Sequence, residues 1–142
     1  MKINSVDAGF SVAPQILASD MTAVAAAGFR SVICNRPDGE GSDQPPFSEI
    51  EAAARAAGLA AIYQPVEPGR ISDAQVAAFA GACAAAGGPV LAYCRTGTRS
   101  ITLWSLGQAG RRPLPEILAC ASAAGYDLMA LAPRIDSRAA AP

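Results

Sequence analysis

The sequence predicts a three-layer α/β domain, with helices flanking a central, mostly parallel sheet of four to five strands. Three observations predict this class. Short apolar runs alternate with helical segments along the chain. The connections between them are short, as in strand–helix–strand units of a parallel sheet. The 142 residues are 51% hydrophobic and 16% charged, which suits a single domain with one buried core.

The predicted strands are short apolar runs separated by turn-forming residues. They span about 3–6, 10–13, 31–35, 59–63 and 89–93. The run 31–35 is typical of a strand that is buried on both faces of a parallel sheet. The last run begins with Pro89, which a strand tolerates at its first residue because the missing N–H lies at the strand end.

The predicted helices lie between and after these strands. They span about 20–27, 48–57, 72–86, 100–109 and 115–124. Ser48 and Ser72 each stand three residues before a Glu or Gln, which is the spacing of a capping box. Proline and glycine make 36–47 a loop. We expect one domain over 1–132 and a flexible tail over 133–142.

Composition excludes several classes of function. The 11 basic and 12 acidic residues nearly cancel, so no broad basic face is expected to bind nucleic acid. The sequence contains no histidine, which excludes a Ser–His–Asp triad, a Cys–His pair and a histidine-rich metal site. Any chemistry must therefore use thiols, carboxylates, arginines or backbone amides, and we expect neither a metal nor a cofactor.

The cysteines and the apolar runs indicate a cytoplasmic protein. The four thiols are far apart, with no CxxC pair, and we expect all of them to be reduced. The N-terminus lacks the apolar stretch of a secretory signal. The uncharged run 74–94 is rich in alanine and is broken by Gly-Gly-Pro. It therefore predicts a helix, a turn and a strand, and not a membrane span.

The loop after the strand 89–93 has the arrangement of a thiolate site. It reads Cys94-Arg95-Thr96-Gly97-Thr98-Arg99-Ser100. Ligands bind at the carboxyl ends of the strands in such sheets, and Cys94 lies at one of these ends. Gly97 permits the bend that points successive amides inward, where they and the helix N-terminus stabilise negative charge. Thiols in such places have pKa values of roughly 3.5–7.5.

Each residue of this loop has an expected role. We expect Cys94 to be the nucleophile and Arg99 a planar donor to an anionic substrate. Ser100 is placed to donate to the sulfur. The remaining anion-binding positions are Arg95, Thr96, Gly97 and Thr98. Cys34 ends a strand at the same edge, and it is either a packing residue or a resolving thiol; we assign Cys83 and Cys120 to packing.

Two families resemble this sequence. The loop is similar to the active-site loop of single-domain rhodaneses, the sulfurtransferases that form a persulfide. The chain as a whole resembles a bacterial phosphatase-like family more closely. This resemblance covers about 1–132, and it rests on the segment 31–40, the segment that begins at Pro89, and Gly125-Tyr126-Asp127. Members of that family occur alone or attached to metallo-β-lactamase-fold hydrolases, including persulfide dioxygenases. The resemblance implies a dual-specificity-phosphatase fold, and a hydrolase or dioxygenase of this kind as a partner.

Two departures from the phosphatase pattern favour sulfur transfer. Cysteine phosphatases place five residues between nucleophile and arginine, usually with a histidine before the cysteine, whereas here four residues intervene and Tyr93 comes first. These phosphatases also carry an aspartate upstream of the nucleophile as general acid. The corresponding segment of this chain, 63–68, contains no aspartate. Glu67, Asp38 and Glu40 are candidate acids. Asp38 is otherwise expected to form a turn, and Glu40 to be an ion-pair partner for Arg36 or Arg99.

The sequence therefore predicts a cysteine-dependent sulfurtransferase. Sulfane sulfur would pass from a small anionic donor, through a Cys94 persulfide, to an acceptor thiol or cyanide. The alternative is a cysteine-dependent phosphatase that acts on phosphotyrosine or small phosphate esters, with Glu67 or Asp38 as general acid. A second alternative is a non-catalytic anion-binding module. None of the three involves nucleic acid or a membrane.

Overall fold

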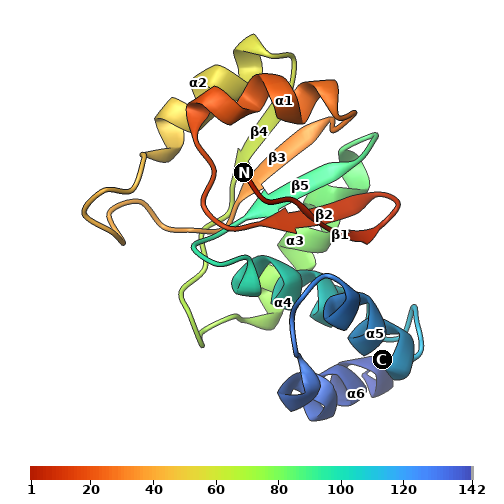
Figure 1. Cartoon of the computed structure of the whole chain (residues 1–142). Coiled ribbons are helices and arrows are strands. Elements are labelled where there is room, and N and C mark those ends of the chain that lie inside the picture. Colours follow the sequence, from red (N-terminus) through yellow and green to blue (C-terminus); the bar gives the residue numbers. More distant parts are fainter. Residues whose placement is uncertain (142) are drawn as a thin grey trace.

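The computed structural model describes residues 1–141 and confirms the predicted α/β class. A five-stranded sheet with the order β1-β2-β5-β3-β4 lies at the centre (Figure 1). β1 pairs with β2 in antiparallel orientation, and the other neighbouring strands are parallel. The strands are β1 (Asn4–Asp7), β2 (Phe10–Ala13), β3 (Ser31–Cys34), β4 (Ala60–Tyr63) and β5 (Val90–Tyr93).

Helices cover both faces of this sheet. Figure 1 shows α1 and α2 on one face and α3 and α4 on the other. α5 and α6 pack against α4 and against each other, outside the sheet. The helices are η1 (Ala18–Asp20), α1 (Met21–Ala26), α2 (Phe47–Ala56), α3 (Asp73–Ala85), α4 (Thr98–Gly107), α5 (Leu114–Ala123), η2 (Met129–Leu131) and α6 (Ala132–Ala140).

Alternation along the central strand divides the core into two layers. In β5, Val90 and Ala92 pack into the cluster that contains residues of α3 to α6. Leu91 and Tyr93 pack into the cluster that contains residues of α1 and α2. All four residues of β5 are buried, because the strand runs between β2 and β3 with a layer on each face. The residue after Tyr93 therefore emerges near the middle of the carboxyl edge.

Local capping was predicted correctly for one helix and not for another. At α3, the Gln75 N–H donates to Ser72 Oγ at 3.1 Å and the Ser72 N–H donates to Gln75 Oε1 at 2.9 Å. This is the predicted capping box. α2 instead begins at Phe47, one residue before the predicted start, and its N-cap residue Pro46 has no side chain that can accept a hydrogen bond. Asp38 supplies the missing acceptor from a distant part of the chain, at 2.8 Å from the Phe47 nitrogen.

The segment predicted as a flexible tail forms α6 up to residue 140. Ile135 is 1% exposed and packs into the cluster of the α4 side. Arg134 and Arg138 both bind Asp73 at the start of α3, at 3.2 and 2.8 Å. Such contacts stabilise a short helix whose own sequence is too weak to do so. Pro142 lies outside the described residues. Across residues 1–141, no helix combines the length and apolarity needed to cross a membrane.

Candidate active site

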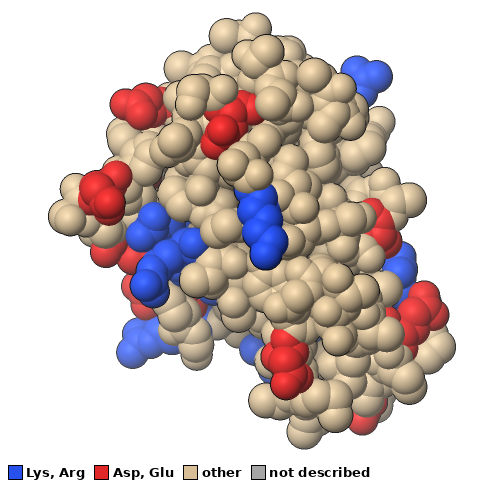
Figure 2. All heavy atoms as spheres, viewed as in Figure 1, with Lys and Arg blue, Asp and Glu red and all other residues tan. Residues whose placement is uncertain are grey.

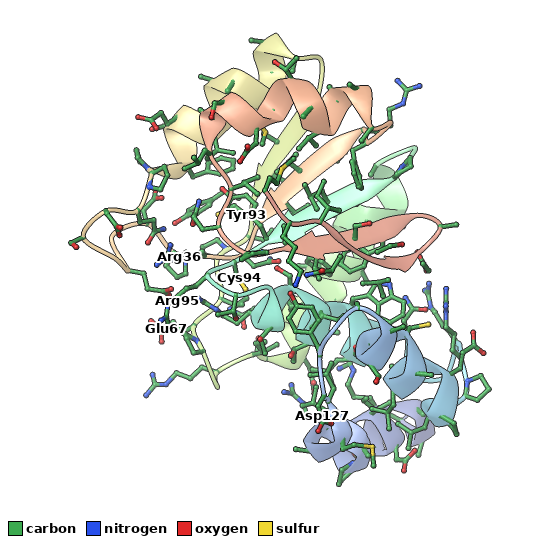
Figure 3. All side chains as sticks on the ribbon, in the orientation of Figure 1. Arg36, Glu67, Tyr93, Cys94, Arg95 and Asp127 are labelled. Atoms are coloured by element: carbon green, nitrogen blue, oxygen red, sulfur yellow. The ribbon has the colours of Figure 1, made fainter. Side chains whose placement is uncertain are left out.

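Cys94 follows β5 directly and lies at the carboxyl edge of the sheet (Figure 3). It is 1% exposed, yet it belongs to neither of the apolar clusters formed within residues 1–141. Its Sγ accepts a hydrogen bond from the main-chain N–H of Gly97 at 3.1 Å. The sulfur is thus held beneath its own loop by a main-chain dipole, an arrangement that favours negative charge on sulfur.

Gly97 makes this hydrogen bond possible through its backbone conformation. Its φ is +92°, in the left-handed region that side chains disfavour. A Cβ at this position would also collide with the hydroxyl of Tyr126. The glycine is therefore required twice, for the turn that aims its amide at the sulfur and for the close approach of Tyr126. The structure thus places Gly97 as the sequence predicts.

Tyr126, which the sequence analysis quoted without giving it a role, supports the loop from outside. Its hydroxyl donates to the carbonyl of Thr96 at 2.9 Å and accepts from Asn4 Nδ2 at 3.2 Å. Burial raises the pKa of Tyr126, so the hydroxyl keeps its proton and remains a donor. The Thr96 carbonyl and the Gly97 N–H belong to one peptide group. Tyr126 therefore orients the same peptide that donates to Cys94.

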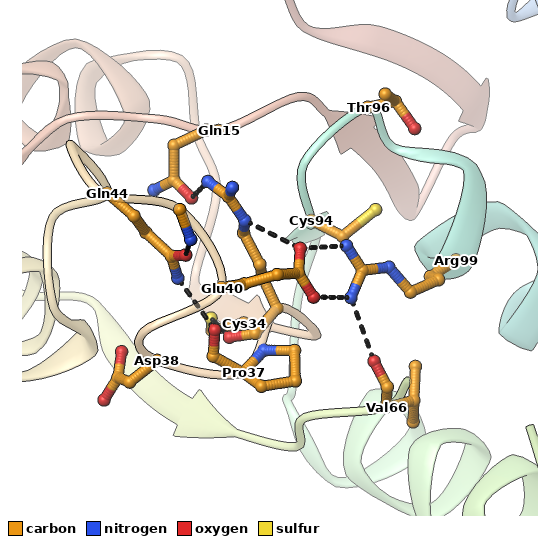
Figure 4. Close-up of polar contacts among 12 residues, drawn as sticks. Gln15, Cys34, Pro37, Asp38, Glu40, Gln44, Val66, Cys94, Thr96 and Arg99 are labelled. Atoms are coloured by element: carbon orange, nitrogen blue, oxygen red, sulfur yellow. Dashed lines mark hydrogen bonds and ion pairs between the residues drawn. The ribbon is translucent and has the colours of Figure 1, made fainter. Parts of the chain in front are cut away.

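Arg99 and Arg36 are both buried, and Figure 4 shows the Glu40 carboxylate against the Arg99 guanidinium. The Arg99 Nη1 and Nη2 groups donate to the two carboxylate oxygens of Glu40 at 2.8 and 2.7 Å. Arg36 Nε donates to Glu40 Oε1 at 3.0 Å. The hydrogen bond from Arg99 is the main reason why the pKa of Glu40 falls to about 2, with Arg36 adding to the effect. The predicted ion-pair role of Glu40 is confirmed with both arginines.

The remaining donors of Arg99 lie on one edge of its guanidinium. Nη1 also donates to the Val66 carbonyl at 3.0 Å, so both of its hydrogens are engaged. Neither the Nε–H nor the second Nη2–H donates to an oxygen atom of the described residues, and the Cys94 sulfur lies beside this guanidinium. These two groups form the planar fork that binds oxyanions bidentately. The pKa of Arg99 is raised, first by Glu40 and further by the nearby Cys94 sulfur, so this fork stays charged.

The sequence predicts that Ser100 donates to the Cys94 sulfur, and this prediction is wrong. Its Oγ donates to Asn35 Oδ1 at 2.8 Å, and Asn35 Nδ2 donates to the Gln64 carbonyl at 2.9 Å. Ser100 is fully buried in the first turn of α4 and faces the end of β3. The hydroxyl therefore links the start of α4 to the loops after β3 and β4. Sequence analysis gave Asn35 no role, because nothing local marks it.

The outer face of the loop is open and basic. Arg95, Thr96 and Thr98 are exposed, and the Thr96 hydroxyl donates to that of Thr98 at 3.0 Å. Basic side chains gather at the left in Figure 2, where Figure 3 labels Arg36 and Arg95. Two hollows border this face, of about 540 and 430 Å³. The loop thus presents anion-binding groups to two separate spaces.

The candidate general acids do not approach the sulfur. The Glu67 side chain is 69% exposed and lies 3.8 Å from Arg70. Asp38 accepts from the Phe47 N–H and so caps α2. Glu40 is held ionised between two arginines. Within residues 1–141, none of these three carboxyl groups hydrogen-bonds to Cys94, and two of them are engaged elsewhere, Asp38 with the Phe47 N–H and Glu40 with two arginines.

Cys34 lies in the core layer that α1 and α2 cover. It pairs in register with Tyr93 and belongs to the cluster of the α1–α2 side. Its S–H donates to the Arg36 carbonyl at 3.2 Å, and burial raises its pKa to about 11. These contacts assign Cys34 to packing. All four cysteines are free thiols, and within residues 1–141 no three His, Cys, Asp or Glu side chains come together as a metal site.

Comparison with known proteins places this geometry among cysteine-phosphatase-like domains. Residues 2–111 match the model of the family described as "Beta-lactamase hydrolase-like protein, phosphatase-like domain". A beta-lactamase hydrolase-like protein of Agrobacterium fabrum is 36% identical over 99% of this chain. The chain spans about one third of the length of the curated relatives that it matches, 33% in that protein.

Solved structures agree with this assignment. The crystal structure of a candidate phosphatase from Neisseria meningitidis has a TM-score of 0.87 and 37% identity, over 97% of this chain and 99% of that one. Pseudomonas aeruginosa TpbA, solved as a variant in complex with phosphotyrosine, has a TM-score of 0.65 and 17% identity, over 96% of this chain and 87% of that one. At 17% identity, the second comparison shows a shared fold alone.

Proposed function

The chain belongs to the phosphatase-like domain family of the beta-lactamase hydrolase-like proteins, and from this premise we propose that it hydrolyses aryl phosphate monoesters with Cys94 as nucleophile. The observation that carries the proposal is the hydrogen bond from the Gly97 N–H to Cys94 Sγ at 3.1 Å. It lies in a loop whose Arg99 keeps one edge of its guanidinium for an anion. The family and its neighbours favour this alternative over the sulfurtransferase that the sequence predicts.

The proposed reaction has two steps. The Cys94 thiolate attacks phosphorus, forming an S–P bond while the P–O bond to the aryl group breaks and the aryloxide leaves. Water then attacks the phosphocysteine, releasing inorganic phosphate and restoring the thiolate. In both steps the free edge of Arg99 and the loop amides bind the phosphoryl oxygens, where negative charge develops.

The positions of the three candidate acids within residues 1–141 guide the expected substrate class. An alkoxide depends more on protonation by a general acid than an aryloxide does, because a phenol, with a pKa of about 10 in tyrosine, is the more acidic leaving group. Glu40, the carboxylate at the site, is held ionised by Arg99 and Arg36 and cannot give a proton near neutral pH. We therefore expect turnover of phosphotyrosine and other aryl phosphates, and much slower turnover of alkyl phosphates.

Sulfur transfer is the second candidate, and the length of the loop favours it. Four residues separate Cys94 from Arg99, so the loop has one amide fewer than the five-residue loop of cysteine phosphatases. The Cys94 thiolate would attack the sulfane sulfur of thiosulfate, forming an S–S bond and releasing sulfite. Cyanide would then take that sulfur as thiocyanate and restore the thiolate. Neither step needs a carboxylic acid.

One preparation separates the candidates when both substrates are assayed on it. We expect steady release of p-nitrophenol from p-nitrophenyl phosphate, and its loss in Cys94→Ser. Thiocyanate from thiosulfate and cyanide, without aryl phosphate turnover, would establish the sulfurtransferase instead. If neither product forms and mass spectrometry finds no sulfur added to Cys94 by thiosulfate, the domain is a non-catalytic anion-binding module.

A partner enzyme belongs to the same proposal. The curated relatives contain about twice as much additional chain as this one covers, since the match spans 33% of the Agrobacterium fabrum protein. We propose that a metallo-β-lactamase-fold hydrolase or dioxygenase works alongside this domain. Co-purification from the native host, with detection of such an enzyme by mass spectrometry, tests this pairing.

A further inference from the structure

The smaller hollow beside the loop has the size and walls of a ligand site. Its volume is about 430 Å³, which falls within the roughly 300–1,000 Å³ of small-molecule sites. One wall is the loop itself and the first turn of α4. The rest of the lining comes from Pro68, Gly69 and Ile71 and from the segment from η2 into α6, where Leu131 and Arg134 lie. Ile71 and Leu131 pack against the core and give this part of the lining an apolar surface.

The charges that line this hollow are all positive. Its charged lining residues are Arg95, Arg99 and Arg134, without a carboxylate among them. Arg99 is compensated by Glu40. Arg95 forms no ion pair with any residue of 1–141, so its charge is uncompensated. A hollow with an apolar wall and a basic rim attracts an anion that also has apolar surface.

Arg134, which lines the same hollow, has donors to spare. Its Nη2 group donates to the Ile71 carbonyl at 2.7 Å and to Asp73 Oδ1 at 3.2 Å, which engages both of its hydrogens. The Nε–H and the Nη1 hydrogens have no acceptor among the described residues. Asp73 is shared with Arg138, at 2.8 Å, so two guanidinium groups have one carboxylate between them. The pair of arginines therefore keeps an excess positive charge.

We propose that this hollow binds an aromatic anion with a second acidic group, which Arg134 recognises. The reacting anion lies on the loop, the ring lies against Ile71 and Leu131, and a carboxylate or phosphate on the far side of the ring reaches Arg134. The proposal rests on the proposed function only in placing the reacting anion on the loop. It makes Arg134 a specificity-determining residue for substrates that carry two anionic groups.

Binding of non-hydrolysable probes to the full chain tests this recognition. The probes are 4-carboxyphenylphosphonate and 4-carbamoylphenylphosphonate, which share a ring and a phosphonate and differ in one charge. A second pair has one methylene between ring and carboxyl, so that the reach to Arg134 is varied. Titration calorimetry at fixed ionic strength should show the carboxylate of at least one pair binding about tenfold more tightly than its amide.

Two variants assign the preference to one side chain. Arg134→Gln should remove the difference between carboxylate and amide. Arg138→Gln is the matched control, because Arg138 also binds Asp73 Oδ1 and one main-chain carbonyl, that of Leu106 at 3.1 Å, but does not line the hollow. It should lose a similar amount of thermal stability and keep most of the preference, because the Nε–H and Nη1 hydrogens of Arg134 stay available although Asp73 then compensates Arg134 alone.

The outcomes separate this inference from the proposed function. Equal binding of carboxylate and amide in both pairs overturns the inference. A failure of all four probes to bind overturns it as well. The wild-type comparison decides this even if Arg134→Gln fails to fold. A tenfold preference in a chain that releases no p-nitrophenol would leave the inference standing and overturn the phosphatase reaction alone.

Discussion

Two thiols lie at the ends of neighbouring parallel strands, and their hydrogen bonds run in opposite directions. Cys34 is the last residue of β3 and is 2% exposed, and Cys94 follows β5 and is 1% exposed. The S–H of Cys34 donates to the Arg36 carbonyl at 3.2 Å. Sγ of Cys94 accepts from the Gly97 N–H at 3.1 Å. Burial is therefore the same for both, and the direction of the hydrogen bond distinguishes them.

From this difference we infer that the loop after each cysteine, and not its depth in the core, decides which thiol can react. A thiol that donates must keep its proton, and burial is the main reason why the pKa of Cys34 rises to about 11. A sulfur that accepts from an amide is stabilised as the thiolate. Each loop also contributes an arginine, Arg36 after Cys34 and Arg99 after Cys94, and both bind Glu40.

Replacing each thiol in turn is the strongest test of the difference between Cys34 and Cys94. Cys94→Ser should lower aryl phosphate turnover by about 10³-fold or more, because the serine hydroxyl is not ionised at neutral pH. Cys34→Ser should retain turnover within a few-fold and lose some thermal stability. Both are measured as kcat/KM and as the melting temperature. A Cys34→Ser enzyme as inactive as Cys94→Ser would remove the distinction.

Gly97→Ala should make Cys94 lose its amide donor. The added Cβ would strain a backbone at φ +92° and meet the Tyr126 hydroxyl, so the peptide must turn away from the sulfur. We expect turnover to fall by about 10²-fold, the order of effect of a misplaced catalytic group. Gly81→Ala is the control, because Gly81 lies within α3 with nothing within 4 Å of an added Cβ. It should stabilise the fold slightly and leave turnover unchanged.

Tyr126→Phe should remove one support of the Thr96–Gly97 peptide group without displacing that group. Losing the donor to the Thr96 carbonyl removes about one hydrogen bond, for which we expect a fall in kcat of about 3- to 10-fold. The pH at which turnover is half-maximal should also rise, an effect that a merely structural role would not produce. Tyr63→Phe removes one hydrogen bond to the Asp38 N–H, at 2.9 Å, and should move neither quantity. Equal shifts in both variants would contradict the positioning role of Tyr126.

Acid should weaken the link between the two loops. The folded pKa of Glu40 is about 2, below its ordinary value of 4.5, so its ion pairs stabilise the fold fully above about pH 5. That contribution is lost as the pH falls from about 4.5 towards 2. In urea unfolding between pH 6 and pH 3, Glu40→Gln should therefore lose less stability on acidification than the wild type. An identical slope for both proteins would rule out this role of Glu40.

How much of the site was predictable depends on sequence distance. Cys94, Gly97 and Arg99 lie within six consecutive residues, so strand, turn and helix signals sufficed to group them. Tyr126 reaches the loop from 30 residues away. The bond from Ser100 to Asn35 spans 65 residues. No local pattern encodes such contacts, because they arise only when β3, β5 and α5 are packed.

The same reasoning applies to the fold. Apolar runs and capping residues sufficed to predict the sheet and the box at Ser72, because their causes are local. They did not suffice for α6, where one buried isoleucine and two arginines bound to Asp73 decide the structure. The proposed substrate class also depends on contacts that no local pattern encodes, since Asp38 caps α2 and Glu40 binds Arg99.

The pH dependence of alkylation at the two thiols tests the central claim most directly. Iodoacetamide is applied to the folded wild type from pH 5 to pH 10, and each cysteine is quantified by mass spectrometry. Since both thiols are similarly buried, the midpoint pH is the informative quantity, and the absolute rate is not. We predict that Cys94, whose sulfur accepts from the Gly97 N–H, is alkylated at a lower pH than Cys34, and that Cys34 does not react before the fold opens. Alkylation of the two thiols over the same pH range would contradict the account.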